Sequence, residues 1–178
     1  LRSRPVLLRG ILISLLIILL SSLYLSLEWN RYEKEASAEA LASGESLKAL
    51  LPQALIVELV EDRASDYESR HAIVKQQLIR LKNTENPIHF SYLLYEKDGK
   101  VMVLADSETL PGADYSQPSQ IHGEVDERYL EPFVTGHSTE IRSSKDGLGT
   151  WISVLVPIKD ADSGRVIAVF GIDYSESE

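Results

Sequence analysis

The longest hydrophobic pattern in the sequence is the run ILISLLIILLSSLYLSL near its beginning. No charged residue lies between Gly10 and Leu27, and this segment would form roughly 27 Å of helix, close to the hydrocarbon thickness of a bilayer. A buried core helix is disfavoured, because the segment is uniformly apolar and directly follows an arginine-rich terminus. The pattern predicts a transmembrane helix over residues 10–27.

The residues on either side of this run predict its orientation. They are Arg2, Arg4 and Arg9 before it, and Trp29 and Tyr32 after it. Basic residues favour the cytoplasmic side and aromatic residues favour the membrane interface. Residues 1–9 are therefore expected in the cytoplasm, and the chain beyond the helix is expected to face the periplasm or the exterior. A cleaved signal peptide is the alternative, with a cleavage site at the later ASA sequence, and it would export the same residues.

Helical patterns continue from residue 28 to residue 87. Tyr32, Ala36 and Ala40 would share one face of an outward extension of the membrane helix, which Gly44 and Pro52 then interrupt. The run QALIVELVED resumes a helical pattern, and a further helix follows a possible capping box of Ser65 and Glu68. The apolar positions of that helix are Tyr67, His71, Val74, Leu78 and Leu81. We interpret its histidine as a packing residue rather than a ligand.

From Ile88 the period of the pattern changes to that of β-strands. The sequence HFSYLLYEKDGKVMVLADS predicts two strands joined at Asp98-Gly99, a strong hairpin signal. An irregular stretch of residues 108–123 precedes a short amphipathic helix that closes near Gly136. Its apolar positions are Tyr129, Leu130 and Phe133. Three more strands follow: STEIRSS, TWISVLVPI and RVIAVFGID.

This order of elements predicts the fold class α+β. We expect a PAS-like five-stranded antiparallel sheet with long N-terminal helices, preceded by one transmembrane helix. The N-terminal helices would cover one face of the sheet, and the segment between the second and third strands, with its short helix, would cover the other. The predicted division is a cytoplasmic N-terminus (1–9), a transmembrane helix (10–27), an extracytoplasmic helical region (28–87) and a sensor sheet (88–175).

Composition narrows the classes of partner. The chain is 44% hydrophobic and 25% charged, which is the balance of a folded domain. Its formal net charge of −9 argues against nucleic acid and anionic lipid as partners. The absence of cysteine excludes disulfides, thiol catalysis and thiolate metal sites. The sequence begins with leucine and carries no recognisable output domain, so we expect a fragment of a longer protein.

Three segments together resemble the extracytoplasmic Cache (PDC-type) sensor domains of bacterial and archaeal receptors: YLLYEKDGKVMVLADSE, DYSQP and GTWISVLVPIKDADSGRVIAVFGIDYS. The resemblance covers residues 31–175. It rests on a P-I-x-D strand end, a Ser-Gly turn and a closing G-I-D, in combination with the N-terminal anchor that precedes these residues. Two departures are Gln117-Pro118-Ser119, where relatives tend to have Pro-Pro-Gly, and Leu148, where they tend to have an aromatic residue. Because these departures lie in loops near any pocket, the ligand of this chain cannot be inferred from those of the relatives.

The resemblance implies a sensing module of a membrane receptor. Such a module binds a small solute, forms a homodimer and transmits a conformational change to a cytoplasmic output domain. Histidine kinase is the first expectation for that output, and diguanylate cyclase is the alternative. The chain itself would then be no enzyme, although the parent protein would be a signalling enzyme.

Candidate ligand-binding residues come from the strand TWISVLVPI and from the first hairpin. Alternation places Val154 and its aliphatic neighbours on one face, and Trp151 and Ser153 on the other. A face that combines an indole with a hydroxyl suits a ligand cleft, and the resemblance implies pocket residues there, although a core tryptophan is the alternative. Further donors and acceptors could come from Tyr92, Asp106, Asp114 and Tyr115.

Catalytic, metal and cofactor sites are not indicated. The histidines at His89, His122 and His137 lack metal-ligand spacing. The sequence DADSG resembles the start of a calcium loop, but Arg165 and Gly171 stand where that loop needs a glycine and a glutamate. Two other functions stay open: an anchored or secreted hydrolase, which needs a nucleophile and a base in one cleft, and a structural dimerisation module.

Overall fold

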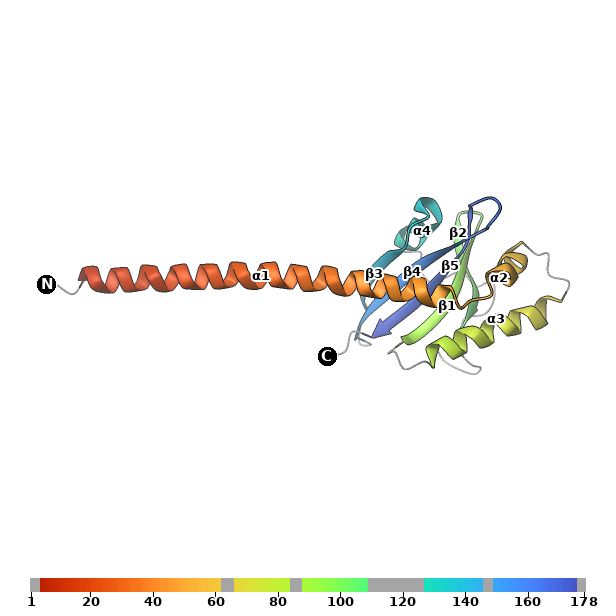
Figure 1. Ribbon diagram of the computed structural model, residues 1–178, viewed down its shortest axis with the longest axis horizontal. Coiled ribbons are helices and arrows are strands. Elements are labelled where there is room, and N and C mark those ends of the chain that lie inside the picture. The colour runs from red at the N-terminus through yellow and green to blue at the C-terminus, as the bar shows by residue number, and fades with distance from the viewer. Residues whose placement is uncertain (1–3, 62–65, 84–87, 109–126, 146–148, 176–178) are drawn as a thin grey trace. The chain divides into compact units, whose positions relative to one another are not determined.

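The computed structural model describes the whole chain except residues 1–3, 62–65, 84–87, 109–126, 146–148 and 176–178 (Figure 1). The chain forms two compact units, Leu1–Glu39 and Ala40–Glu178. Helix α1 (Arg4–Lys48) makes up the described part of the first unit and contributes its last turns to the second.

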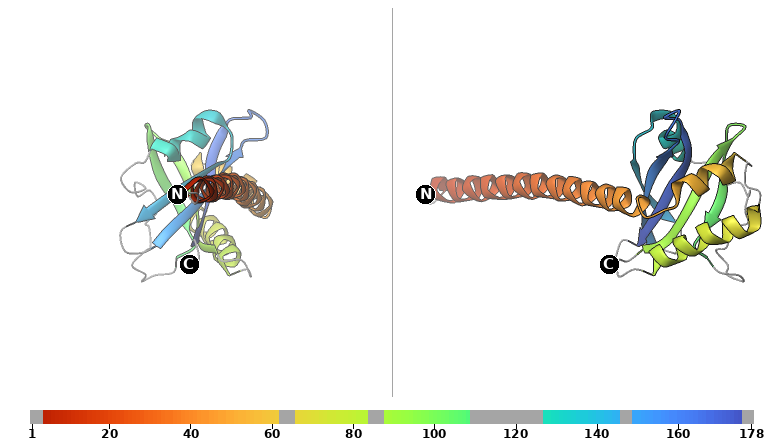
Figure 2. Two further views of the ribbon diagram at one scale, coloured as in Figure 1. Left: turned by 90° about the vertical axis from the view of Figure 1, so that its left-hand side faces the viewer. Right: turned by 45° about the vertical axis from the view of Figure 1, so that its right-hand side comes forward.

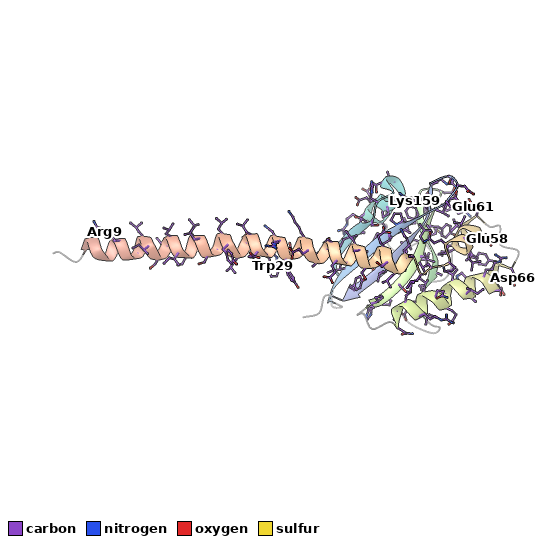
Figure 3. All side chains as sticks on the ribbon, in the orientation of Figure 1. Arg9, Trp29, Glu58, Glu61, Asp66 and Lys159 are labelled. Carbon is purple, nitrogen blue, oxygen red and sulfur yellow. The ribbon has the colours of Figure 1, made fainter. Side chains whose placement is uncertain are left out.

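The described part of the first unit is a helix with a long apolar segment. Within it, an 18-residue window has a mean hydropathy of 2.4, and none of its residues is buried. Figure 3 shows side chains projecting outward from the helix between the labelled Arg9 and Trp29. By length and composition, α1 is able to cross a membrane.

The second unit is built on a five-stranded antiparallel sheet with the strand order β2-β1-β5-β4-β3. Its strands are β1 (Ile88–Lys97), β2 (Lys100–Asp106), β3 (Thr139–Lys145), β4 (Gly149–Lys159) and β5 (Val166–Ser175). Asp98 and Gly99 join β1 to β2 with φ values of 53° and 74°, as a type I′ hairpin turn requires. The predicted α+β class and the PAS-like sheet are confirmed.

One face of the sheet packs against helices α2 (Gln53–Val60) and α3 (Tyr67–Lys82) and against the end of α1 (Figures 1 and 2). The core on this side contains Ile56, Val74, Leu78, Leu93, Ile158 and Phe170. His71 Nε2 donates a hydrogen bond to the carbonyl oxygen of Leu104 at 2.9 Å, and its ring stacks on Tyr67. These are the contacts of a packing residue, the role that the sequence predicted for it. Ser65 of the predicted capping box lies outside the described residues.

The predicted helix interruption at Gly44 is wrong, because α1 continues to Lys48. Gly44 is buried, and a Cβ atom there would lie 2.8 Å from Val154 Cγ1 and 2.9 Å from Val156 Cγ2. The residue therefore allows the helix to approach the sheet closely. This contact outweighs the low helix propensity that the sequence suggested.

The other face of the sheet packs against η1 (Glu127–Leu130) and α4 (Glu131–Thr135). The core on this side contains Tyr92, Leu94, Val101, Val103, Ile141, Leu155 and Val169, with Phe90, Tyr129, Leu130, Phe133 and Val166 packed against it. Gly136 ends α4 in the left-handed conformation, with φ of 66°. The predicted short helix and its end are confirmed.

Candidate functional site

Strand pairing brings several polar side chains together on the face of the sheet that α4 packs against. In the register, Tyr92 of β1 pairs with Gly171 of β5, and Ser153 of β4 pairs with Asp173 of β5. Paired residues in antiparallel strands point to the same face, and so do residues two apart along one strand. Tyr92, Ser153 and Asp173 consequently share one face.

Two contacts define the polar cluster on this face. The Tyr92 hydroxyl donates a hydrogen bond to Asp173 Oδ1 at 2.9 Å. The hydroxyl of Tyr129, from η1, lies 3.5 Å from Ser153 Oγ. We call Tyr92, Tyr129, Ser153 and Asp173 the Asp173 cluster.

The Asp173 cluster lies in a largely apolar environment. Tyr92 is 6% exposed and Ser153 is 2% exposed. Leu94, Ile141 and Leu155 belong to the same core, with Phe90, Leu130 and Phe133 packed against it. In such surroundings each hydrogen bond is electrostatically stronger than in water.

Burial is the largest cause that raises the pKa of Tyr92 well above its ordinary value. The negative charge of Asp173 is the next cause, and Tyr129 adds to it. The phenol therefore stays protonated at neutral pH and is held as a hydrogen-bond donor to Asp173. The arrangement presents a carboxylate and three hydroxyls, a set suited to binding a polar solute.

The structure brings together only some of the six residues that the sequence predicted for the site. Tyr92 and Ser153 lie in the Asp173 cluster. Asp106 pairs with Tyr92 in the register, but its Oδ1 accepts a hydrogen bond from Lys75 Nζ of α3 at 3.0 Å. Asp114 and Tyr115 lie outside the described residues, and so does the side chain of Trp151.

Sequence reasoning missed Asp173 and Tyr129 as members of the cluster. Asp173 ends the run AVFGID, and the two-residue period of a strand places it on the same face as Val169 and Gly171. An acidic residue at an inward position of a central strand was therefore an available signal. The position of Tyr129 opposite Ser153 depends on how η1 packs on the sheet, which no local pattern encodes.

Two surface pockets lie elsewhere on the second unit. One, of about 460 Å³, is lined by residues of α2, by Arg70 and by the β4–β5 turn, including Glu58 and Lys159 (Figure 3). The other, of about 420 Å³, is lined in part by Tyr67, Tyr95 and Leu104. Within the described residues, no group of three or more His, Asp or Glu side chains could hold a metal ion.

No family model matches the chain, and no curated protein matches it. Solved structures with similarity to it include extracytoplasmic sensor domains, the class that the sequence resembles. One is an extracellular domain assigned to a histidine kinase, mmHK1S-Z2, with 18% identity and a TM-score of 0.42 over 83% of this chain and 60% of that chain.

Two further similar structures are a chemoreceptor domain and a GAF domain. The ligand-binding domain of the Campylobacter jejuni chemoreceptor Tlp3, in complex with L-valine, has 18% identity and a TM-score of 0.39 over 81% of this chain and 61% of that chain. The GAF domain of nlh2 from A. aeolicus has 16% identity and a TM-score of 0.41 over 71% of this chain and 78% of that chain. The present chain thus spans about 60% of the length of the two sensor domains.

Proposed function

We propose that this chain is the extracytoplasmic sensing module of a transmembrane signalling receptor and that it binds a small solute at the Asp173 cluster. The observation that carries the proposal is the position of this cluster. Four polar side chains gather among apolar ones on one face of the sheet, and the end of α1 packs on the opposite face of the same two strands.

The chemistry of the cluster favours a solute that carries hydrogen-bond donors and a positive charge. Asp173 supplies a carboxylate, and charge-assisted hydrogen bonds to a carboxylate are stronger than neutral ones. The Tyr92 hydroxyl already donates to Asp173 and can accept a hydrogen bond from the solute, whereas the hydroxyls of Tyr129 and Ser153 can donate or accept. Together they would orient the solute. The apolar neighbours would exclude water from the contact.

The strands that carry the cluster also contact α1. Ser153 and Asp173 alternate with Val154 and Ile172, whose side chains lie on the other face near Gly44. A solute that shifts β4 against β5 would therefore alter the surface on which α1 rests. Because packed interfaces tend to have discrete arrangements, a small shift at the cluster can bias the position of the helix.

We further propose that α1 crosses the membrane once with its N-terminus in the cytoplasm, so that the chain from Ser37 onward is outside. The receptor would be a homodimer through α1. Its output domain, on the parent chain, would be a histidine kinase, with a diguanylate cyclase as the alternative. The apolar window of α1 and the basic residues before it support the topology.

A thermal-shift experiment on the full chain in lipid nanodiscs tests solute binding. The probes are three two-carbon solutes of different charge, ethylammonium, acetate and ethanol, together with L-valine as a zwitterion. A ligand at one hundred times its dissociation constant stabilises the folded protein by about 2.7 kcal/mol. We expect ethylammonium or L-valine to raise the melting temperature and acetate and ethanol to leave it unchanged.

Two variants assign that shift to a site. Asp173→Asn should abolish it. Asp162→Asn removes the same charge from the exposed turn between β4 and β5 and should retain it. Equal shifts in the wild type and Asp173→Asn, or stabilisation by none of the probes, would contradict the proposal.

A further inference from the structure

Gly171 lies in the middle of the sheet, with Tyr92 of β1 on one side and Leu155 of β4 on the other. A Cβ atom at this position would lie 2.1 Å from Tyr92 Cε2 and 2.4 Å from Tyr92 Cζ. Real side chains do not approach so closely. Gly171 is not among the glycines with positive φ, so its backbone would accept other residues. The requirement for glycine is therefore steric.

The space above Gly171 is filled by the ring of Tyr92. The phenol hydroxyl reaches Asp173, which lies two residues further along β5, so the ring must cross the strand at the one position that has no side chain. A glycine inside a strand often marks such a close approach. The ring is almost fully buried in this position.

We propose that Gly171 is a positioning residue that leaves room for the Tyr92 ring over β5. We call this position of the ring its seat, and we propose that the ring in its seat limits the size of the solute that can contact Asp173. This inference rests on the proposed function, because it concerns the same cluster. It assigns Tyr92 a second role beside hydrogen bonding. Because the ring occupies volume next to the carboxylate, we expect small ammonium compounds to bind in preference to larger ones.

The first test needs no solute. The full chain in nanodiscs is labelled with ¹³C in the tyrosine rings, and Tyr92→Phe identifies the Tyr92 signal. In Gly171→Ala the added methyl group should displace the ring from its seat and its hydroxyl from Asp173. The Tyr92 signal should then shift, and the phenol should ionise at lower pH than in the wild type, because burial and Asp173 hold its pKa up. An unchanged signal with an unchanged titration overturns the proposal.

A second variant covers the case in which Gly171→Ala does not fold. Replacing the ring in Gly171→Ala/Tyr92→Leu removes the atoms that the new methyl group would meet. This double variant should regain a cooperative thermal transition. If it is as unstable as Gly171→Ala alone, the clash with Tyr92 is not the reason for the glycine, and the proposal fails.

The third test measures size selectivity with methylammonium and butylammonium by calorimetry. Tyr92→Leu should change the ratio of their dissociation constants at least tenfold in favour of butylammonium. Tyr95→Leu is the matched control, because it makes the same substitution on the same strand, in a side chain that packs against the opposite core. It should keep the wild-type ratio.

The outcomes separate this inference from the proposed function. If the ammonium probes bind and Tyr92→Leu keeps the wild-type ratio, the size role is wrong and the sensing function stands. If Gly171→Ala displaces the ring but no probe binds the wild type, the seat exists while both the proposed site and the size role fail.

Discussion

A substitution at Gly44 tests whether the end of α1 is fitted tightly to the sheet. In Gly44→Ala, the new Cβ atom would lie 2.8 Å from Val154 Cγ1 and 2.9 Å from Val156 Cγ2. Both valines are fully buried, and β-branched side chains have few alternative rotamers. The contact can therefore be relieved only if the helix or the sheet moves.

The expected magnitude follows from two opposing terms. Overpacking a close contact typically costs about 1 to 3 kcal/mol. Replacing glycine by alanine inside a helix gains about 1 kcal/mol. Because both valines are buried and cannot move aside, the cost should lie toward the upper end of its range. The net effect should then be a destabilisation of about 1 to 2 kcal/mol, which corresponds to roughly 5 to 30 times faster opening of the affected hydrogen bonds.

Hydrogen exchange measured by mass spectrometry on the full chain in nanodiscs provides the assay. We expect faster exchange of the β4 and β5 amides in Gly44→Ala. Ser46→Ala is the matched control. Ser46 is exposed and its hydroxyl donates a hydrogen bond to the carbonyl oxygen of Ala42 in the same helix, so this change should not speed exchange in the sheet. Unchanged or slower exchange of β4 in Gly44→Ala would refute the close fit.

Three further predictions concern pH, topology and assembly. Burial raises the pKa of Glu45, but hydrogen bonds from Lys48 and Ser138 outweigh burial and hold that pKa below the usual 4.5. The ionised Glu45 should therefore stabilise the folded protein fully above pH 4.5, and this stabilisation should disappear as the pH falls further. Thermal unfolding followed between pH 3 and 6 should show a smaller loss of stability at low pH in Glu45→Gln than in the wild type. Lys97→Cys, in a chain without other cysteines, should react with a membrane-impermeant maleimide in intact cells, and labelling only after lysis would reverse the proposed topology. Ala36→Cys should form cross-linked dimers in membranes more readily than Lys34→Cys on the opposite side of the helix, and equal cross-linking would remove this face from the dimer interface.

The sequence predicted those parts of the fold that depend on local chemistry. The Asp98-Gly99 turn has the conformation that its residues favour, and alternation along β4 correctly separated Val154, against α1, from Leu155, in the opposite core. Both results follow from the two-residue period of strands and from the ability of glycine to adopt positive φ.

The sequence did not predict features that depend on long-range packing. Asp106 looked available as a ligand, but its partner Lys75 comes from α3, which the local pattern could not place beside it. The Asp173 cluster forms because β5 lies between β1 and β4, so its members are remote in sequence. Gly44 predicted a helix break on propensity alone, whereas its contact with the sheet needs a residue without a side chain.

Solute binding at the Asp173 cluster is the central claim, and tyrosine NMR tests it most directly. Tyr92 and Tyr129 belong to the cluster, whereas Tyr67 and Tyr95 line the separate pocket of about 420 Å³. With ¹³C-tyrosine in the full chain, saturating ethylammonium should shift the signals of Tyr92 and Tyr129 and leave those of Tyr67 and Tyr95 in place. Shifts confined to Tyr67 and Tyr95, or no shift in any of the four, would contradict the claim.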